Sequence, residues 1–182
     1  MNAVEHIVEC YFRYCKNCFT MVDVKVRAGN NRQCDLLAYD AIGRKQYHVE
    51  SSVTHCWQPS ANELRELFDK KFRGVPQKRE GKRTDYTRNR NYFENICQTY
   101  ENVGFDPQRV ERIFVIWSFP EQDVIAELTK AYKNEYDISV AVMSFRNEIL
   151  LHLTEKIGTS NYEDEVLRTL SLLRQRELQQ VP

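Results

Sequence analysis

The sequence predicts a single α/β domain, spanning residues 1–182, in which helices cover both faces of a mixed β-sheet. Apolar residues make up 42% of the chain, which is enough to build a core. Apolar side chains follow a helical period up to Cys15, and from Phe19 they alternate with polar ones, as in a half-buried strand. A continuous apolar run over residues 112–119 is typical of a central strand that is covered on both faces.

The first half of the chain predicts a helix, three strands and a second helix. The apolar stripe of the first helix contains Val4, Ile7, Val8, Tyr11, Phe12 and Cys15. Strands are expected over residues 21–27, 32–39 and 45–53. The short turns between these strands indicate an antiparallel meander. The next helix begins at Ser60, which has capping-box spacing to Glu63.

The second half of the chain predicts helices that alternate with strands. Helices are expected over residues 91–103, 120–135 and 162–179, and strands over residues 112–119 and 138–145. Strands linked by helices extend the meander into a mixed sheet. No apolar run approaches the roughly 18 residues of a membrane span, and the N-terminus lacks the basic start of an export signal. We therefore expect a cytoplasmic protein without a membrane partner.

Two acidic residues, Asp35 and Glu50, lie within otherwise apolar predicted strands. If the hairpin between them closes near residues 41–44, the two acids lie roughly opposite each other. Carboxylates held together away from water repel, so one must take up a proton or a cation must lie between them. Oxygen ligands of this type suit Mg²⁺ or Mn²⁺, which support phosphodiester hydrolysis. The alternative is that both acids lie on a solvated face of the sheet.

This pattern resembles the PD-(D/E)xK, or restriction-endonuclease-like, nuclease superfamily. The resemblance covers residues 2–145 and rests on the first helix, the meander, and the segments "CDLLAYD" and "YHVESS". It implies a restriction-endonuclease-like αβββαβ core. It also implies that Asp35 and Glu50 bind the divalent metal, assisted by the backbone carbonyl of Ser51. In this family a helical glutamate often joins the acids, and Glu5 is preferred here over Glu9.

The sequence departs from the family at the motif lysine, which follows the glutamate by two residues. Ser52 occupies that position, and its hydroxyl can bind a water but carries no charge. Lys25 on the neighbouring strand and Lys70 or Lys71 on the following helix are candidate replacements. The implied function is a metal-dependent endonuclease that cleaves DNA. The alternative is a catalytically inactive module that binds nucleic acid or assembles a larger complex.

A basic segment, residues 70–90, holds nine basic and two acidic residues in a chain whose net charge is zero. Such a concentration of positive charge indicates an anionic polymer as partner, and we expect nucleic acid, specifically DNA. The candidate contacts are Lys70, Lys71, Arg73, Arg79, Lys82, Arg83, Arg88 and Arg90. The alternative is a solvated charged loop. A homodimer or a larger complex is compatible with the sequence.

Two further groups of residues have metal-ligating chemistry. Cys15 and Cys18 have the spacing of half a zinc site, which His55 and Cys56 would complete. The alternative is that the two cysteines are small buried residues at a helix end. His48 lies beside the predicted acidic pair, where a buried, hydrogen-bonded histidine is more common than a ligand.

Overall fold

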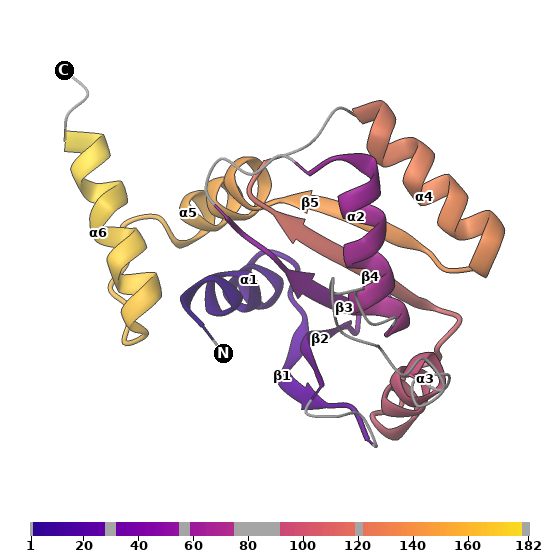
Figure 1. The fold of residues 1–182 in the computed structure, drawn as a ribbon. Coiled ribbons are helices and arrows are strands. Elements are labelled where there is room, and N and C mark those ends of the chain that lie inside the picture. The colour runs from indigo at the N-terminus through magenta and orange to yellow at the C-terminus, as the bar shows by residue number, and fades with distance from the viewer. Residues whose placement is uncertain (1, 28–31, 55–58, 75–91, 119–121, 180–182) are drawn as a thin grey trace.

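The computed structural model describes residues 2–27, 32–54, 59–74, 92–118 and 122–179. These residues form a five-stranded mixed sheet with helices on both faces, as the sequence predicts (Figure 1). The strands are β1 (Phe19–Lys25), β2 (Gln33–Asp40), β3 (Lys45–Ser51), β4 (Val110–Ile116) and β5 (Val140–Ser144). Their order across the sheet follows their order in the chain.

Six α-helices and two π-helical segments surround this sheet in the described residues. The α-helices are α1 (Ala3–Tyr14), α2 (Ala61–Phe68), α3 (Tyr92–Asn102), α4 (Gln122–Tyr136), α5 (Leu151–Ile157) and α6 (Glu165–Gln179). The π-helical segments are η1 (Asp69–Arg73) and η3 (Phe145–Leu150). Among the described residues no helix combines the length and the apolar character needed to cross a membrane.

The sequence predicts no element over residues 146–161, where most of η3 and all of α5 form. The signal was present, because Ile149, Leu153 and Ile157 recur every four residues and are all buried against α1. β5 runs directly into the π-helical segment η3, which begins at Phe145. Because the apolar run of the predicted strand includes Phe145, the sequence shows no break at which a helix would begin.

The first three strands form the antiparallel meander that the sequence predicts. In the β2–β3 pair, Leu36 lies opposite Val49, and one step further the same register places Asp35 opposite Glu50. β3 pairs in parallel with β4, and β4 pairs in parallel with β5. β3 is therefore the strand at which the sheet changes from antiparallel to parallel pairing.

The two faces of the sheet carry different helices. One face packs against α1, η3 and α5 through Leu36, Ala38, Tyr47 and Val49 of the meander. The other face is covered by α2, η1, α3 and α4, which enclose Phe114 and Ile116 of β4 (Figure 1). Because side chains alternate along a strand, His48 and Glu50 point to this second face.

Candidate functional site

Asp35 and Glu50 converge where β2 begins and β3 ends. The Ser51 backbone N–H donates a hydrogen bond of 3.0 Å to Asp35 Oδ2. The Asp35 backbone N–H lies 3.4 Å from Glu50 Oε1. Glu50 is buried, and the side chain of Asp35 is only 12% exposed. The two acids therefore do not lie on a solvated face of the sheet, which was the alternative interpretation of the sequence.

Lys71 of η1 contacts both acids. Its Nζ lies 2.5 Å from Glu50 Oε2 and 3.4 Å from Asp35 Oδ2. One ammonium thus places a positive charge beside two adjacent carboxylates that are largely removed from water. Ser52, at the family's lysine position, instead donates its backbone N–H to the Val115 carbonyl at 2.9 Å and extends the β3–β4 pairing.

The local sequence explains why Lys71 reaches the sheet. Helix α2 begins with the capping box of Ser60 and Glu63. Phe68 and the adjacent Phe72 of η1 are fully buried, and both rings pack edge-on against Phe114 of β4. These two anchors hold the π-helical turn against the sheet. Single π-helical turns often occur at functional sites.

Gly74 ends this turn in a left-handed conformation, with φ of 71°. A Cβ atom at this position would lie 2.3 Å from Tyr92 Cβ, which is closer than atoms can approach. Only glycine therefore fits between η1 and the start of α3. Gly74 thus both ends η1 and allows Tyr92, the first residue of α3, to pack closely against it.

A chain of hydrogen bonds links Glu50 to a buried histidine, His48, and a buried tyrosine, Tyr100. His48 Nε2 lies 2.8 Å from Glu50 Oε1, and His48 Nδ1 lies 2.6 Å from the Tyr100 hydroxyl oxygen. His48 and Tyr100 are both fully buried. Ligand atoms of Cys34, His48 and Glu50 all lie within 4.8 Å of one another. The sequence predicts the helix over residues 91–103 that carries Tyr100 but gives no signal for its contact with His48.

The environment separates the proton affinities of the two acids. Burial, together with the negative charge of Glu50, raises the pKa of Asp35 to about 6 against the opposing influence of Lys71. Burial also favours the protonated form of Glu50, but hydrogen bonds and charge from His48 and Lys71 outweigh it and hold its pKa at about 2. Burial alone would lower the pKa of Lys71, yet the charges of Glu50 and Asp35 raise it. Near neutral pH, Glu50 is thus ionised, and Asp35 is the acid close to its titration point.

The donor set of this site fits a small divalent cation. Asp35 Oδ2 and Glu50 Oε2 both contact the same group, the ammonium of Lys71 on η1. The two carboxylates are therefore close enough together to be ligands of one cation. Carboxylate oxygens are the ligands that Mg²⁺ and Mn²⁺ prefer. A cation bound here would share the two carboxylates with Lys71. The raised pKa of Asp35 would then fall, because a divalent charge favours its ionised form.

Two other predicted catalytic residues lie elsewhere. Glu5 occupies the first turn of α1, where its carboxylate accepts hydrogen bonds from the backbone and side-chain nitrogens of Asn2. The capping box explains this glutamate, and α1 covers the sheet face opposite to Glu50. Lys25 pairs with Gln33 at the end of β1 and is exposed. No contact described in the structure brings Glu5 or Lys25 to the acidic pair.

Three of the predicted nucleic-acid contacts lie in η1. Lys71 is turned into the site, whereas Arg73 pairs with Asp69 at 2.7 Å and lies over the Tyr136 ring. The backbone carbonyl of Lys70 accepts a hydrogen bond from Arg32. Arg79, Lys82, Arg83, Arg88 and Arg90 lie outside the described residues.

The predicted zinc ligands remain an expectation. Cys15 and Cys18 have free thiols, and Cys18 is buried. His55 and Cys56 fall outside the part of the chain that the structure describes. Burial raises the pKa of Cys18 to about 11, which disfavours the thiolate that zinc binds.

Comparisons with protein-family models, with curated proteins and with solved structures gave no match for this chain.

Proposed function

We propose that this protein is a metal-dependent nuclease of the PD-(D/E)xK type, in which Lys71 replaces the missing motif lysine. The observation that carries this proposal is the contact of one ammonium with two carboxylates on neighbouring strands, the buried Glu50 and the partly buried Asp35. The element order from α1 through β4 supports a restriction-endonuclease-like core. Ser52 is compatible with catalysis because a charged group reaches the same acids from another element.

Each residue of the site has a chemical role in this proposal. Asp35, Glu50 and the carbonyl of Ser51 would hold Mg²⁺ or Mn²⁺. When bound, such an ion supplies an activated water and neutralises charge on the phosphate. Lys71 is placed to orient the attacking water and to stabilise negative charge that develops in the transition state. His48, held by Tyr100, fixes the carboxylate of Glu50 in the orientation that a ligand must have.

We propose DNA as the substrate because of where the basic segment begins. Lys71 belongs to residues 70–90, in which nine basic residues are concentrated. Each lysine or arginine that contacts a phosphate strengthens binding in a salt-dependent way. A substrate held by this segment would therefore be close to the acids that Lys71 contacts.

The test is cleavage of supercoiled plasmid with Mg²⁺ or Mn²⁺ by four proteins purified in parallel. These are the wild type, Asp35→Asn, Lys71→Met and the control Lys133→Met, whose lysine pairs with the exposed Asp137. We expect the wild type and the control to cut, and the first two variants to lose at least about 100-fold in rate. EDTA should stop all cutting.

Two results would contradict the proposal in different ways. Equal cutting by the wild type, Asp35→Asn and Lys71→Met would show that the activity comes from a contaminant. Salt-sensitive DNA binding by the wild type, without cleavage under either metal, would instead favour the inactive nucleic-acid-binding or complex-assembly module.

A further inference from the structure

Arg112 of β4 is a buried charge that the acidic site does not use. Its side chain is only 2% exposed. Its two hydrogen bonds within the described residues go to the backbone carbonyls of Val110, at 3.0 Å, and Pro107, at 3.2 Å. Neither acceptor carries a charge, and Arg112 Nε has no hydrogen-bond partner in the described part of the chain. An unsatisfied buried donor on a charged group is costly, so its position calls for an explanation.

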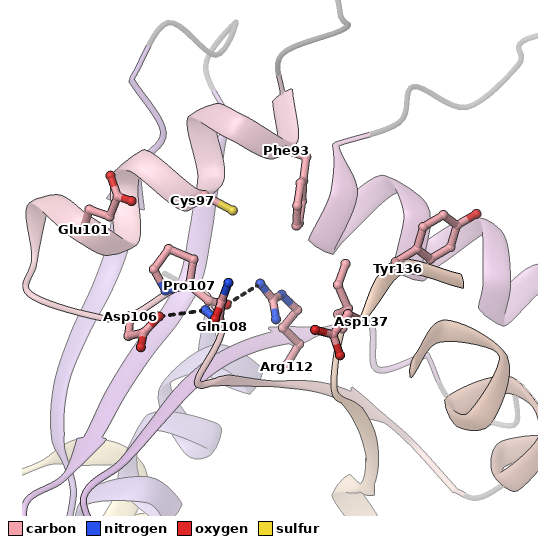
Figure 2. A pocket seen from close by; sticks show the side chains of 10 residues that line it. Phe93, Cys97, Glu101, Asp106, Pro107, Gln108, Arg112, Tyr136 and Asp137 are labelled. Carbon is pink, nitrogen blue, oxygen red and sulfur yellow. Dashed lines mark hydrogen bonds between the residues drawn. The ribbon is translucent and has the colours of Figure 1, made fainter. Parts of the chain in front are cut away.

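This guanidinium lies at the wall of a cavity of about 490 Å³. Figure 2 shows Arg112 reaching from β4 toward Phe93, with Pro107 on one side and Asp137 on the other. Tyr136 and Ile138 complete the apolar wall. Pockets that hold small molecules have volumes of roughly 300–1,000 Å³ and combine apolar walls with few polar groups.

The carboxylates that line the cavity are less able than Arg112 to attract a ligand. Glu101, Asp106 and Asp137 are all exposed to water. Asp137 is paired with Lys133 at 2.6 Å, and Asp106 accepts a hydrogen bond from the Gln108 backbone. Water and salt screen exposed charges, whereas a buried charge acts in a medium of lower dielectric constant. Arg112 is therefore the charged group of the cavity wall whose field water screens least.

We propose that this cavity binds a small organic anion, whose carboxylate or phosphate group pairs with Arg112 and whose flat body packs on Phe93. The guanidinium matches such groups because it offers parallel N–H donors, and its two backbone hydrogen bonds leave donors unused. The Phe93 ring centroid lies 5.9 Å from the guanidinium carbon. The Phe93 side chain would shift to admit the anionic group to the guanidinium, and the flat body of the ligand would then pack against the shifted ring.

This inference is independent of the proposed nuclease activity. The cavity is built from α3, from the residues before β4 and from the end of α4, whereas the acidic pair lies at β2, β3 and η1. Tyr100 lies between them, because its hydroxyl contacts His48 and its ring lies 5.5 Å from the Arg112 guanidinium.

Three probes of similar shape test the proposal: benzoate, phenyl phosphate and benzylamine. For a dissociation constant of about 1 mM, a probe at about 10 mM should raise the melting temperature by about 3 °C. We expect this rise with benzoate or phenyl phosphate, and their relative effect identifies the preferred anionic group. Benzylamine should have no effect, because its charge is reversed. In NMR spectra the Arg112 Nε–H signal should shift with the two anions.

Two variants connect the response to this cavity. Arg112→Met keeps an unbranched side chain without the charge and should lose the response. Cys97→Asp places a carboxylate on the cavity wall, where it would pair with Arg112 and exclude the probe. The matched control is Gln98→Asp, which adds the same charge at the neighbouring exposed position of α3 and should respond as the wild type does.

The proposal is overturned if benzylamine stabilises the protein as much as benzoate does, or if none of the probes shifts the Arg112 signal. An unchanged response in Cys97→Asp would also overturn it, even if Arg112→Met fails to fold.

Discussion

Replacing Asp35 by asparagine should stabilise the protein in the absence of divalent metal. The pKa of Asp35 is raised from 3.8 to about 6, chiefly by burial and then by the charge of Glu50. A tenfold change in proton affinity corresponds to about 1.4 kcal/mol, so ionised Asp35 costs the folded protein about 3 kcal/mol at neutral pH. Asparagine removes the charge and keeps an oxygen for the Ser51 N–H. The Asp35 side chain is 12% exposed, so solvent screens part of this cost. We therefore expect Asp35→Asn to raise the free energy of unfolding by about 2 kcal/mol.

The pH dependence of this gain has a defined sign. Because the folded pKa of Asp35 is raised, the folded wild type binds more protons than the unfolded chain between about pH 4 and about pH 6. The stability of the wild type therefore falls as pH rises through that window. The advantage of Asp35→Asn should be complete above about pH 6 and should vanish below about pH 4.

Urea unfolding in EDTA, at about pH 4 and about pH 8, measures this difference directly. Asp123→Asn, at an exposed position in the first turn of α4, is the control and should change stability by less than about 0.5 kcal/mol. Mg²⁺ should then reverse the order of the two proteins, because it stabilises the wild type but binds Asp35→Asn poorly. A variant that is less stable than the wild type at both pH values would refute the conclusion that burial and the charge of Glu50 raise the pKa of Asp35.

Three further predictions concern the surroundings of the acids. Lys71→Met leaves the carboxylates without their ammonium and should cost about 3–5 kcal/mol in urea unfolding with EDTA, a loss that Mg²⁺ partly restores. Gly74→Ala meets Tyr92 Cβ at 2.3 Å and should lower stability by about 1–3 kcal/mol in the same assay, whereas no loss would contradict the left-handed turn. Tyr100→Phe removes a partner of the buried His48 and should cost about 1–3 kcal/mol in thermal unfolding, and an unchanged melting temperature would contradict that contact.

The sequence predicts the pairing of the acids because two local rules determine it. Alternation assigns Asp35 and Glu50 to defined faces of their strands, and a short hairpin limits how far the strands can slide. The lysine is harder to predict. Lys70 and Lys71 are adjacent on a predicted helix, and only the π-helical turn, anchored by Phe72, decides which of them faces the sheet.

Contacts between distant elements are the part that sequence reasoning missed. Tyr100 has the helical spacing of a core residue, and its hydroxyl meets His48 only because α3 packs over β3. Arg112 stands at the edge of an apolar run, where a solvated strand end is the ordinary expectation. The resemblance to the nuclease family places Glu5 at the site. Asn2, however, precedes Glu5 at capping-box spacing, and this local signal favours a helix cap over a metal ligand.

The change of pairing at β3 has a consequence for how the protein reaches its folded state. The meander needs only short loop closures, whereas β4 must return across a much longer stretch of chain to lie beside β3. An early species with β1, β2 and β3 alone would keep Glu50 hydrated. The unfavourable dehydration of that carboxylate then belongs to the slow step in which β4 joins the sheet, so variants at Glu50 should alter the refolding rate more than the unfolding rate.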